Sequence, residues 1–212
     1  MYCPAHFAEH DDAALRDLIR RQPLATLVTL GSDGLQVDHV PLLLAENDEG
    51  APVLRGHVAR ANPMWKQLSP GAPAVAVFHG PDTYVSPSWY PTKRQHGKAV
   101  PTWNYTTVHA RGPMRVIEAA DWLRAQVEAL TAQQEAGLDE PWKVDDAPPD
   151  YIEKMLAAIV GIEIEIATLE GKCKASQNQP AENRAGIVRA LEAAGDDDSR
   201  EMARLVARDD GR

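Results

Sequence analysis

The first 120 residues contain several short stretches in which hydrophobic and polar side chains alternate, a period typical of β-strands. Gly, Pro, Asn and Asp residues separate these stretches and favour tight turns. The pattern predicts strands at residues 24–30, 35–44, 53–58, 74–79, 84–86, 104–111 and 113–117. Short strands joined by tight turns favour a closed barrel, because closure removes the exposed edges of a sheet.

Pro41 lies inside the second of these strands, where its missing backbone N–H prevents regular pairing. The strand is therefore expected to lie at an edge or to carry a bulge at this point. A bulge leaves backbone groups free for a ligand, which makes the neighbouring Asp38 and His39 candidates for a site. The turn before this strand, at residues 31–34, contains two glycines and predicts a hairpin.

The remaining segments read mainly as helices. Helices are expected at residues 11–22, 63–68, 120–135, 151–158 and 184–194, followed by a short terminal helix capped by Ser199. Residues 159–169 alternate again and predict a half-exposed strand, with Glu163 and Glu165 on its polar side. Residues 172–180 are expected to form a polar loop, and the final residues 208–212 to fray.

These elements predict an α+β fold that is mainly β with flanking helices. We expect residues 1–180 to form the barrel domain and residues 181–212 to form a C-terminal helical extension with an acidic tail. The chain is long enough to bury a full core. It contains no apolar run of about 20 residues that would span a membrane and no secretory signal at its start.

The charge balance restricts the partners of the protein. The chain has 22 Lys and Arg against 31 Asp and Glu, a net charge of −9. DNA-binding domains are usually basic, so direct DNA binding is not expected. The one basic cluster consists of Lys93, Arg94, His96 and Lys98. The two cysteines, Cys3 and Cys173, lie far apart in the sequence and predict no disulfide framework, which fits a reducing cytoplasm.

Residues 78–112 concentrate aromatic side chains, with Trp89, Trp103, Tyr84, Tyr90 and Tyr105 among Pro and Gly turns. Strand and turn residues alternate here, so most of these rings cannot share one helix. One interpretation is the wall of a pocket for a flat ligand. The other is ordinary core and hairpin packing, and the composition does not separate the two.

A strand that runs into a helix at residues 56–63 suggests an anion site, because helix N-terminal N–H groups and the Arg60 guanidinium would both favour a phosphate. The alternative is an arginine that is solvated or paired with an acid. No Gly-rich nucleotide motif, hydrolase Ser elbow or metal-binding pattern is present, since Cys3, His6 and His10 lack a fourth ligand. No general acid or base can be assigned.

Several longer motifs resemble one known family. They are MYCPAHF at the start, GHVARANPMW at 56–65, FHGPDTYVSPSWY at 78–90, VPTWNYTTVHARG at 100–112 and KCKASQNQP at 172–180. In this order they resemble the PaiB-type family of FMN-binding negative transcriptional regulators. The resemblance extends from Met1 to about Leu205.

The resemblance implies an FMN-binding split β-barrel, as in pyridoxamine-phosphate-oxidase-like flavoproteins, and a homodimer with FMN at its interface. It places the isoalloxazine ring against His39, Val40, Pro41 and Leu42, and the phosphate near His57, Val58, Ala59, Arg60 and Asn62. It assigns the contribution of the partner subunit to Trp103, Asn104 and Tyr105. Further contacts to the phosphate or the ribityl chain would come from Lys172, Lys174, Ser176, Gln177 and Asn178.

The same resemblance suggests three functions. The first is an FMN-binding homodimeric regulator that acts indirectly, through flavin sensing or a partner protein. The second is an FMN-dependent oxidoreductase acting on a small molecule, and the third is a haem-binding split-barrel protein. Related oxidases place a hydroxyl and a second cation on the phosphate, whereas this chain has Ala59, Arg60 and Ala61, which predicts looser retention of FMN.

Overall fold

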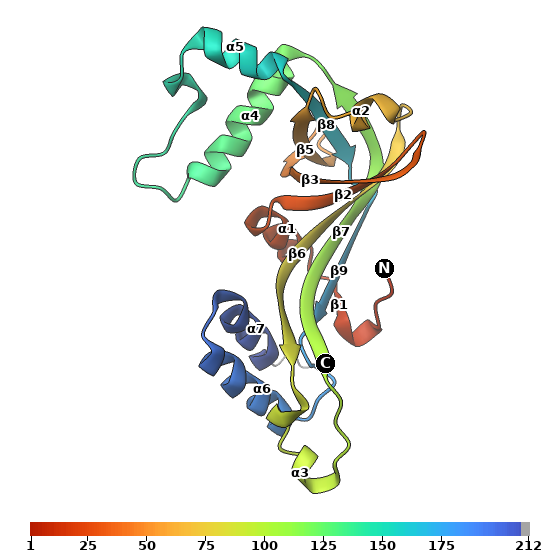
Figure 1. Ribbon diagram of the computed structural model, residues 1–212, viewed down its shortest axis with the longest axis vertical. Helices are drawn as coiled ribbons and strands as arrows, with labels where there is room; N and C mark the ends of the chain where they lie inside the picture. The colour runs from red at the N-terminus through yellow and green to blue at the C-terminus, as the bar shows by residue number, and fades with distance from the viewer. Residues whose placement is uncertain (209–212) are drawn as a thin grey trace. The chain divides into compact units, whose positions relative to one another are not determined.

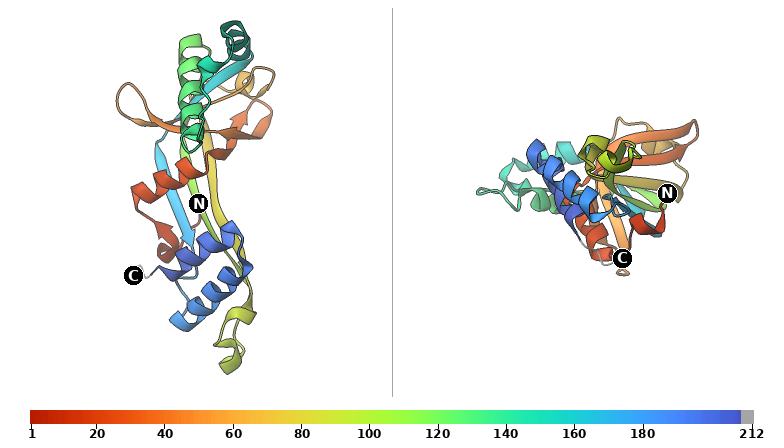
Figure 2. Two further views of the ribbon diagram at one scale, coloured as in Figure 1. Left: turned by 90° about the vertical axis from the view of Figure 1, so that its left-hand side faces the viewer. Right: turned by 90° about the horizontal axis from the view of Figure 1, so that it is seen from below.

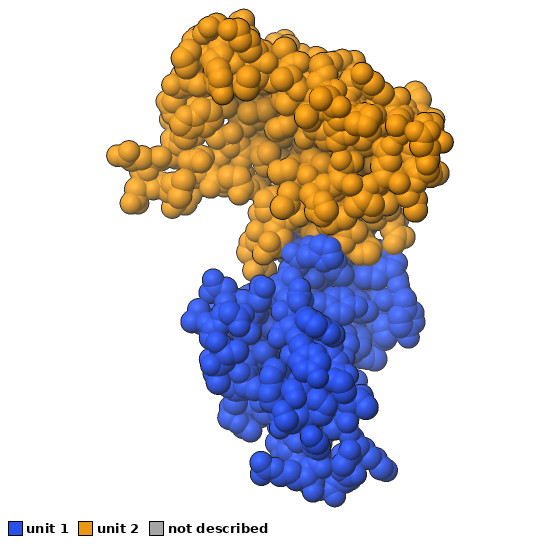
Figure 3. All heavy atoms as spheres, viewed as in Figure 1, with its two compact units in different colours: residues 1–18, 79–108, 170–212 blue, residues 19–78, 109–169 orange. Residues whose placement is uncertain are grey.

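The computed structural model describes residues 1–208 and divides the chain into two compact units that are interleaved in the sequence. Unit 1 contains Met1–Leu18, His79–Val108 and Glu170–Arg212, and unit 2 contains Ile19–Phe78 and His109–Leu169 (Figure 3).

The strands of the described residues join in one sheet of nine strands (Figure 1). They are β1 (Ala8–Glu9), β2 (Leu24–Gly31), β3 (Gly34–Pro41), β4 (Leu43–Glu46), β5 (Pro52–Ala59), β6 (Ala72–Val85), β7 (Thr102–Ile117), β8 (Ile159–Glu165) and β9 (Thr168–Lys174). The order is β3-β2-β6-β7-β8-β5-β4, and β9 pairs with both β1 and β7. The long strands β6 and β7 contribute residues to both units.

Helices flank these strands (Figure 2). They are α1 (Asp12–Arg21), α2 (Met64–Gln67), α3 (Lys93–His96), α4 (Ala120–Glu135), α5 (Pro149–Ala157), α6 (Ala181–Ala194) and α7 (Asp197–Ala207), with short 3₁₀ turns η1 (Ala5–Phe7), η2 (Pro87–Trp89) and η3 (Val144–Asp146). No helix of residues 1–208 has the length and apolar character needed to cross a membrane. The expected α+β class is confirmed.

Unit 2 is closed into a barrel by a bend at Leu42. β3 pairs with β2, whereas β4, directly after the bend, pairs with β5 at the other end of the sheet order. The backbones approach closely at Gly56 of β5, where a Cβ atom would lie 2.7 Å from Leu42 Cδ2 and 2.8 Å from the Pro41 carbonyl oxygen. The predicted break near Pro41 therefore turns the strand around a corner and closes the sheet.

The core of unit 2 follows the alternation of its strands. Ala25 and Leu27 of β2, and Ile162 and Ile164 of β8, are buried. Outside the barrel, Trp122 of α4 lies against Gly161 of β8, where any Cβ atom would overlap the indole ring.

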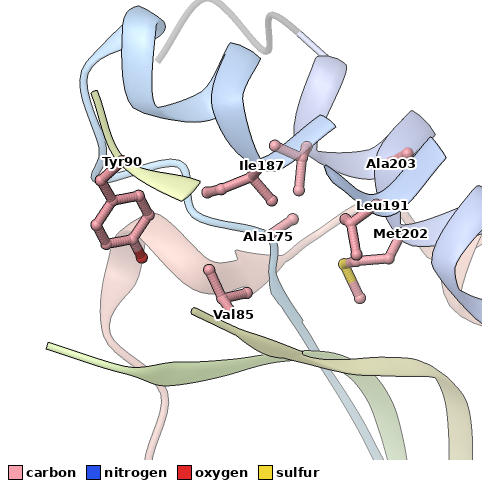
Figure 4. Packing of buried hydrophobic residues seen from close by; sticks show 8 residues of the cluster. Val85, Tyr90, Ala175, Ile187, Leu191, Met202 and Ala203 are labelled. Carbon is pink, nitrogen blue, oxygen red and sulfur yellow. The ribbon is translucent and has the colours of Figure 1, made fainter. Parts of the chain in front are cut away.

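Unit 1 has a separate hydrophobic core beneath α6 and α7 (Figure 4). Its buried members are Val85, Tyr90, Ala175, Ile187, Leu191, Met202, Ala203 and Val206. Burial raises the pKa of the Tyr90 hydroxyl, because the ionised form would lose its hydration. Gly195, in the left-handed region at φ 75°, ends α6 and permits the sharp turn into α7.

Several predicted boundaries are wrong. β6 runs without a break through residues 80–82, where a turn was expected, and β7 passes straight through Gly112. At Gly112 a Cβ atom would overlap the Glu165 carbonyl oxygen, so that the glycine serves a close backbone approach rather than a turn. The basic loop contains the short helix α3.

The region after residue 159 also differs from its prediction. The expected strand 159–169 is divided between β8 and β9, and β9 extends to Lys174, into the expected polar loop. Asp196, rather than Ser199, caps the last helix, because its side chain accepts the Ser199 N–H. The expected fraying concerns residues 208–212, of which 209–212 lie outside the described residues, and the domain boundary at residue 180 stays a prediction.

The prediction that Glu163 is exposed is also wrong. Glu163 is 4% exposed and lies opposite Arg55 of β5 on one side and Arg115 of β7 on the other. Its two carboxylate oxygens accept from the Arg55 Nε at 2.7 Å and from the Arg115 Nε at 2.8 Å. The alternating pattern placed the side chain correctly on the polar face, but two arginines cover that face.

Candidate functional site

Two of the predicted binding segments meet in unit 2, at the corner between β3 and β5. The Asn62 Nδ2 donates to Asp38 Oδ1 at 2.7 Å, which joins the end of β5 to the strand that carries His39. The two strands also approach closely at Gly56, where a Cβ atom would overlap Leu42 and the Pro41 carbonyl oxygen. Asp38 and Asn62 are 24 residues apart in the sequence, and barrel closure brings them together.

Side chains of the first segment point alternately outward and into the core. His39 and Pro41 are exposed, whereas Val40 and Leu42 are buried. Val40 and Leu42 therefore have no side-chain surface to offer a ligand from outside, and the Leu42 N–H already donates to the Pro23 carbonyl at 2.8 Å. A ligand at this corner would contact His39 and Pro41.

The link after β5 is held by its own polar groups. The Asn62 Oδ1 accepts the Met64 N–H at 2.9 Å and thereby starts α2 after Pro63. Val58 is buried and Ala59 is exposed. The Trp65 indole N–H donates to the Arg60 carbonyl at 3.1 Å, which folds α2 back over the link.

Arg60 is engaged in three hydrogen bonds within unit 2. Its Nε donates to the Ala157 carbonyl at 2.8 Å, one terminal nitrogen to Glu118 Oε2 at 2.6 Å, and the other to the Ile159 carbonyl at 3.1 Å. A guanidinium has five N–H donors, so two remain. With its side chain 37% exposed, Arg60 fits a phosphate that approaches from solvent, although Glu118 competes for the same charge.

His57 is fixed by a residue that the sequence analysis did not select. Its Nδ1 lies 2.8 Å from Oε1 of Gln126, a buried residue of α4. Gln126 falls three residues after Leu123, on the apolar face of the helix. A polar residue on that face could have indicated a buried hydrogen-bond partner. The pairing gives His57 a packing role and leaves its Nε2 as the nitrogen that can meet a ligand.

The other predicted segments lie together in unit 1, on β7 and β9. Asn104 and Ser176 form a buried pair, with the Asn104 Nδ2 and Ser176 Oγ 2.9 Å apart. Ser176 has φ 59°, a left-handed conformation uncommon for a residue with a side chain. The pair holds the end of β9 against β7 rather than facing solvent.

Two lysines of β9 are partly committed. The Lys174 Nζ donates to Thr102 Oγ1 at 2.6 Å, and the Lys172 Nζ donates to the Tyr2 carbonyl at 3.3 Å while lying 5.0 Å from the centre of the Tyr105 ring. Each ammonium has three donors, so that capacity remains.

The two amides that follow β9 differ. The Gln177 Nε2 donates to the Cys173 carbonyl at 2.6 Å, and its Oε1 accepts the Ala175 N–H, so Gln177 shapes the turn. Asn178 is exposed.

Trp103 and Tyr84 form an exposed aromatic pair in unit 1. Their ring centres are 6.0 Å apart in an edge-to-face arrangement, and the residues are 53% and 45% exposed. The two rings form a surface that a flat ligand or a partner can cover. Tyr90 belongs to the core, as the packing interpretation of residues 78–112 expects, and the pocket wall stays a prediction for Trp103 and Tyr84.

The residues that sequence reasoning missed are acidic or neutral partners of the selected cations and amides. They are Glu118, Gln126 and Thr102. Single surface carboxylates give no local signal, because their importance arises from pairing across the fold. Within residues 1–208 no group of three or more His, Cys, Asp or Glu could hold a metal ion.

The sheet that closes at the Leu42 bend gives unit 2 the architecture of the split-barrel proteins. The family model described as "Putative FMN-binding domain" matches residues 1–168, and the chain belongs to this family. The predicted resemblance to the PaiB-type family is thereby confirmed.

Relatives and solved structures agree with this assignment. An uncharacterized protein of Emericella nidulans is 35% identical, covering 97% of this chain and 96% of the relative. The "Protease synthase and sporulation protein PAI 2" of Bacillus subtilis is 27% identical over the same shares of the two chains. The structure of the FAD and haem binding protein from Mycobacterium smegmatis is similar in fold, with a TM-score of 0.60 and 21% identity over 89% of this chain and 80% of that chain.

Proposed function

We propose that this protein binds FMN and acts as a homodimeric negative regulator, with the flavin as its sensing group. The observation that carries the flavin site is the junction in unit 2 where Asn62 binds Asp38 and β3 crosses Gly56. It joins the strand that carries the exposed His39 and Pro41 to the link that carries Arg60. In this proposal the strand supplies contacts to the ring and the link supplies the cation for the phosphate.

Each side chain has a distinct part in this proposal. Arg60 holds the phosphate through its two unused N–H donors, and His39 with Pro41 contacts the ring system. The Nε2 of His57, oriented through Gln126, is available for a polar edge. Bound FMN would supply electron transfer or redox sensing, and the protein would supply binding and orientation.

The homodimer is supported by an exposed apolar face on the β2–β3 hairpin of unit 2. Residues paired across two antiparallel strands point to the same side of the sheet. The pairs Leu24 with Pro41, Thr26 with His39, Val28 with Val37, and Leu30 with Leu35 therefore share one face. Four of these side chains are large, hydrophobic and more than half exposed: Leu24, Leu30, Leu35 and Val37.

This face is continuous with His39 and Pro41 of the flavin site. A second copy of the chain placed on it would cover the apolar side chains and lie next to the ligand, and contributions from the partner's Trp103 and the partner's Tyr105 are part of the proposal. An apolar surface on an antiparallel sheet is a liability unless it is covered.

Regulation is proposed to be indirect, because the structure favours no DNA-binding surface on the C-terminal helices. α6 and α7 are joined by a short turn at Gly195, an arrangement that helix-turn-helix proteins use. On α7, however, Arg200 and Arg204 are paired with Asp197 and Glu201 of the same helix. These acidic neighbours reduce the positive charge that a phosphate backbone would meet on α7.

The test is to purify the native protein and identify its chromophore by absorbance and mass spectrometry, followed by titration of the flavin-free protein with FMN and riboflavin. Colourless protein that does not quench FMN fluorescence would disprove flavin binding. Turnover of NADH or NADPH through the bound flavin would favour the oxidoreductase alternative over the regulator.

A further inference from the structure

Unit 1 contains a second site for an anion, in a pocket that lies between η2, α3 and α6. The pocket has a volume of about 410 Å³, within the range of small-molecule sites. The residues that line it include Arg94 and Arg189, the aromatic residues Trp89 and Tyr90, and Ser88. None of the described residues that line it is acidic, in a chain where acids outnumber bases by 31 to 22.

The pocket is built by a close approach of α6 to the 87–91 segment. Gly186 of α6 packs directly on the backbone of Trp89, where any Cβ atom would overlap the Trp89 carbonyl oxygen. One turn earlier on the same helix face, the buried Asn183 accepts the Thr92 hydroxyl at 3.0 Å. These two contacts fix the segment that carries Arg94 against the helix that carries Arg189.

The two arginines differ from most others in this chain. Arg55, Arg60, Arg115, Arg124, Arg200 and Arg204 each form an ion pair with a carboxylate. Within residues 1–208, Arg94 and Arg189 have no hydrogen-bond or ion-pair partner for their guanidinium groups. Two unpaired guanidiniums at the rim of one pocket provide the donors that a phosphate group takes in bidentate fashion.

We propose that this pocket binds a nucleotide, with Arg94 and Arg189 on the phosphate and the Trp89 indole beside the base. Trp89, a partly exposed aromatic residue of the lining, favours a flat ring attached to the phosphate over inorganic phosphate alone. The pocket is separate in sequence and in unit from the proposed flavin corner of β3 and β5. It gives the basic cluster of residues 93–98 a role in recognising a small anion.

A nucleic-acid backbone fits the same chemistry less well. A protein that binds duplex DNA through its phosphates makes on the order of six to ten such contacts, spread along a basic stripe. Here two arginines line one pocket of a chain that is acidic overall, so a small ligand is favoured over a nucleic acid.

The experiment is calorimetric titration of FMN-saturated protein with AMP, with adenosine and inorganic phosphate as partial ligands. We expect one AMP per chain, weaker binding of both partial ligands, and an affinity that falls as salt rises. Arg94→Ala and Arg189→Ala should each weaken AMP by about tenfold and leave adenosine unchanged. Arg184→Ala is the matched control, because Arg184 lies on α6 and donates to the Arg208 carbonyl.

Four outcomes would overturn the proposal. They are no AMP binding at millimolar concentration, AMP affinity unchanged in both arginine variants, release of FMN by AMP, and arginine-dependent binding of a 20-base-pair duplex without AMP binding. The third would assign AMP to the flavin site and the fourth would make the surface a DNA contact. Arg189→Lys, which keeps the charge, and thermal melting of each variant separate loss of the ligand contact from loss of the fold.

Discussion

The Arg60 guanidinium donates to the Glu118 carboxylate at 2.6 Å, so that the cation proposed for the flavin phosphate already has an anionic partner. Both side chains are substantially exposed, at 37% and 56%. Exposed pairs of this kind contribute about 0–1 kcal/mol to stability. A ligand phosphate can therefore separate the pair with little loss of stability. Glu118 competes with the phosphate for Arg60 and is not required for the fold.

Changing either partner should alter FMN affinity in opposite directions. Arg60→Ala is expected to weaken FMN about tenfold more than riboflavin, because riboflavin lacks the phosphate. Glu118→Gln removes the competing charge and should tighten FMN several-fold relative to riboflavin. Fluorescence titration of both flavins measures this. Arg124→Ala, an exposed arginine paired with Glu128, is the control, and equal losses of both flavins in Arg60→Ala would contradict the phosphate role.

Glu163 should be among the most sensitive polar residues of the barrel. Its removal leaves Arg55, whose side chain is only 24% exposed, without its carboxylate. We expect Glu163→Ala to lower the free energy of unfolding by about 2–4 kcal/mol, less than the fully buried limit because Arg115 is open to solvent. Urea unfolding measures the change. Glu165→Ala, on the exposed end of the same strand, should change stability by less than about 0.5 kcal/mol.

The apolar face of β2 and β3 should control assembly. Val37→Asp places a charge at the centre of this face, where Val37 is opposite Val28. We expect a homodimer to become a monomer, because a desolvated unpaired charge opposes burial. Analytical ultracentrifugation of the two proteins gives the result. Glu46→Lys changes an exposed residue of β4 away from this face and should leave assembly intact; a wild-type monomer at micromolar concentration would refute the dimer.

Gly186→Ala should destabilise unit 1. The added Cβ would overlap the Trp89 carbonyl oxygen, which is backbone and cannot swing aside. Separation of α6 from the 87–91 segment would cost about 1–3 kcal/mol, as for other overpacked sites. Gly137→Ala is the matched control, because no atom lies within 4 Å of a Cβ at that position. Similar melting temperatures of the two variants would show that α6 packs differently.

Asp196 should give the last helix a dependence on acid pH. Hydrogen bonds from the Ser199 hydroxyl and the Ser199 N–H lower the pKa of Asp196 below its ordinary value of 3.8. A lowered pKa in the folded state means that the stabilisation is present above the unfolded value and is lost as the pH falls through the folded one. Asp196→Asn should therefore flatten the loss of stability below pH 3.8. Urea unfolding of this variant and of Asp198→Asn at several acid pH values would test the assignment, and identical curves would contradict it.

Local sequence determined much of the fold. The hairpin at residues 31–34 formed as the glycines and alternation predicted, and Pro41 marked the place where the strand leaves its partner. Both outcomes depend on backbone freedom and a missing N–H, which are properties of single residues. Strand ends were less predictable, because β6 and β7 continue through Gly80 and Gly112. Close contacts with Thr106 and with the Glu165 backbone, both distant in the sequence, explain these glycines.

The candidate site likewise depends partly on local sequence and partly on tertiary structure. The sequence by itself identified the segments around His39 and Arg60, through motifs and through the strand-to-helix pattern. Tertiary structure decided that these segments meet at Gly56, that Arg60 is paired with Glu118, and that Val40 and Leu42 face the core. Closure of the barrel brings together residues far apart in the chain, and an ion pair depends on distance in space. No pattern of neighbouring residues contains that information.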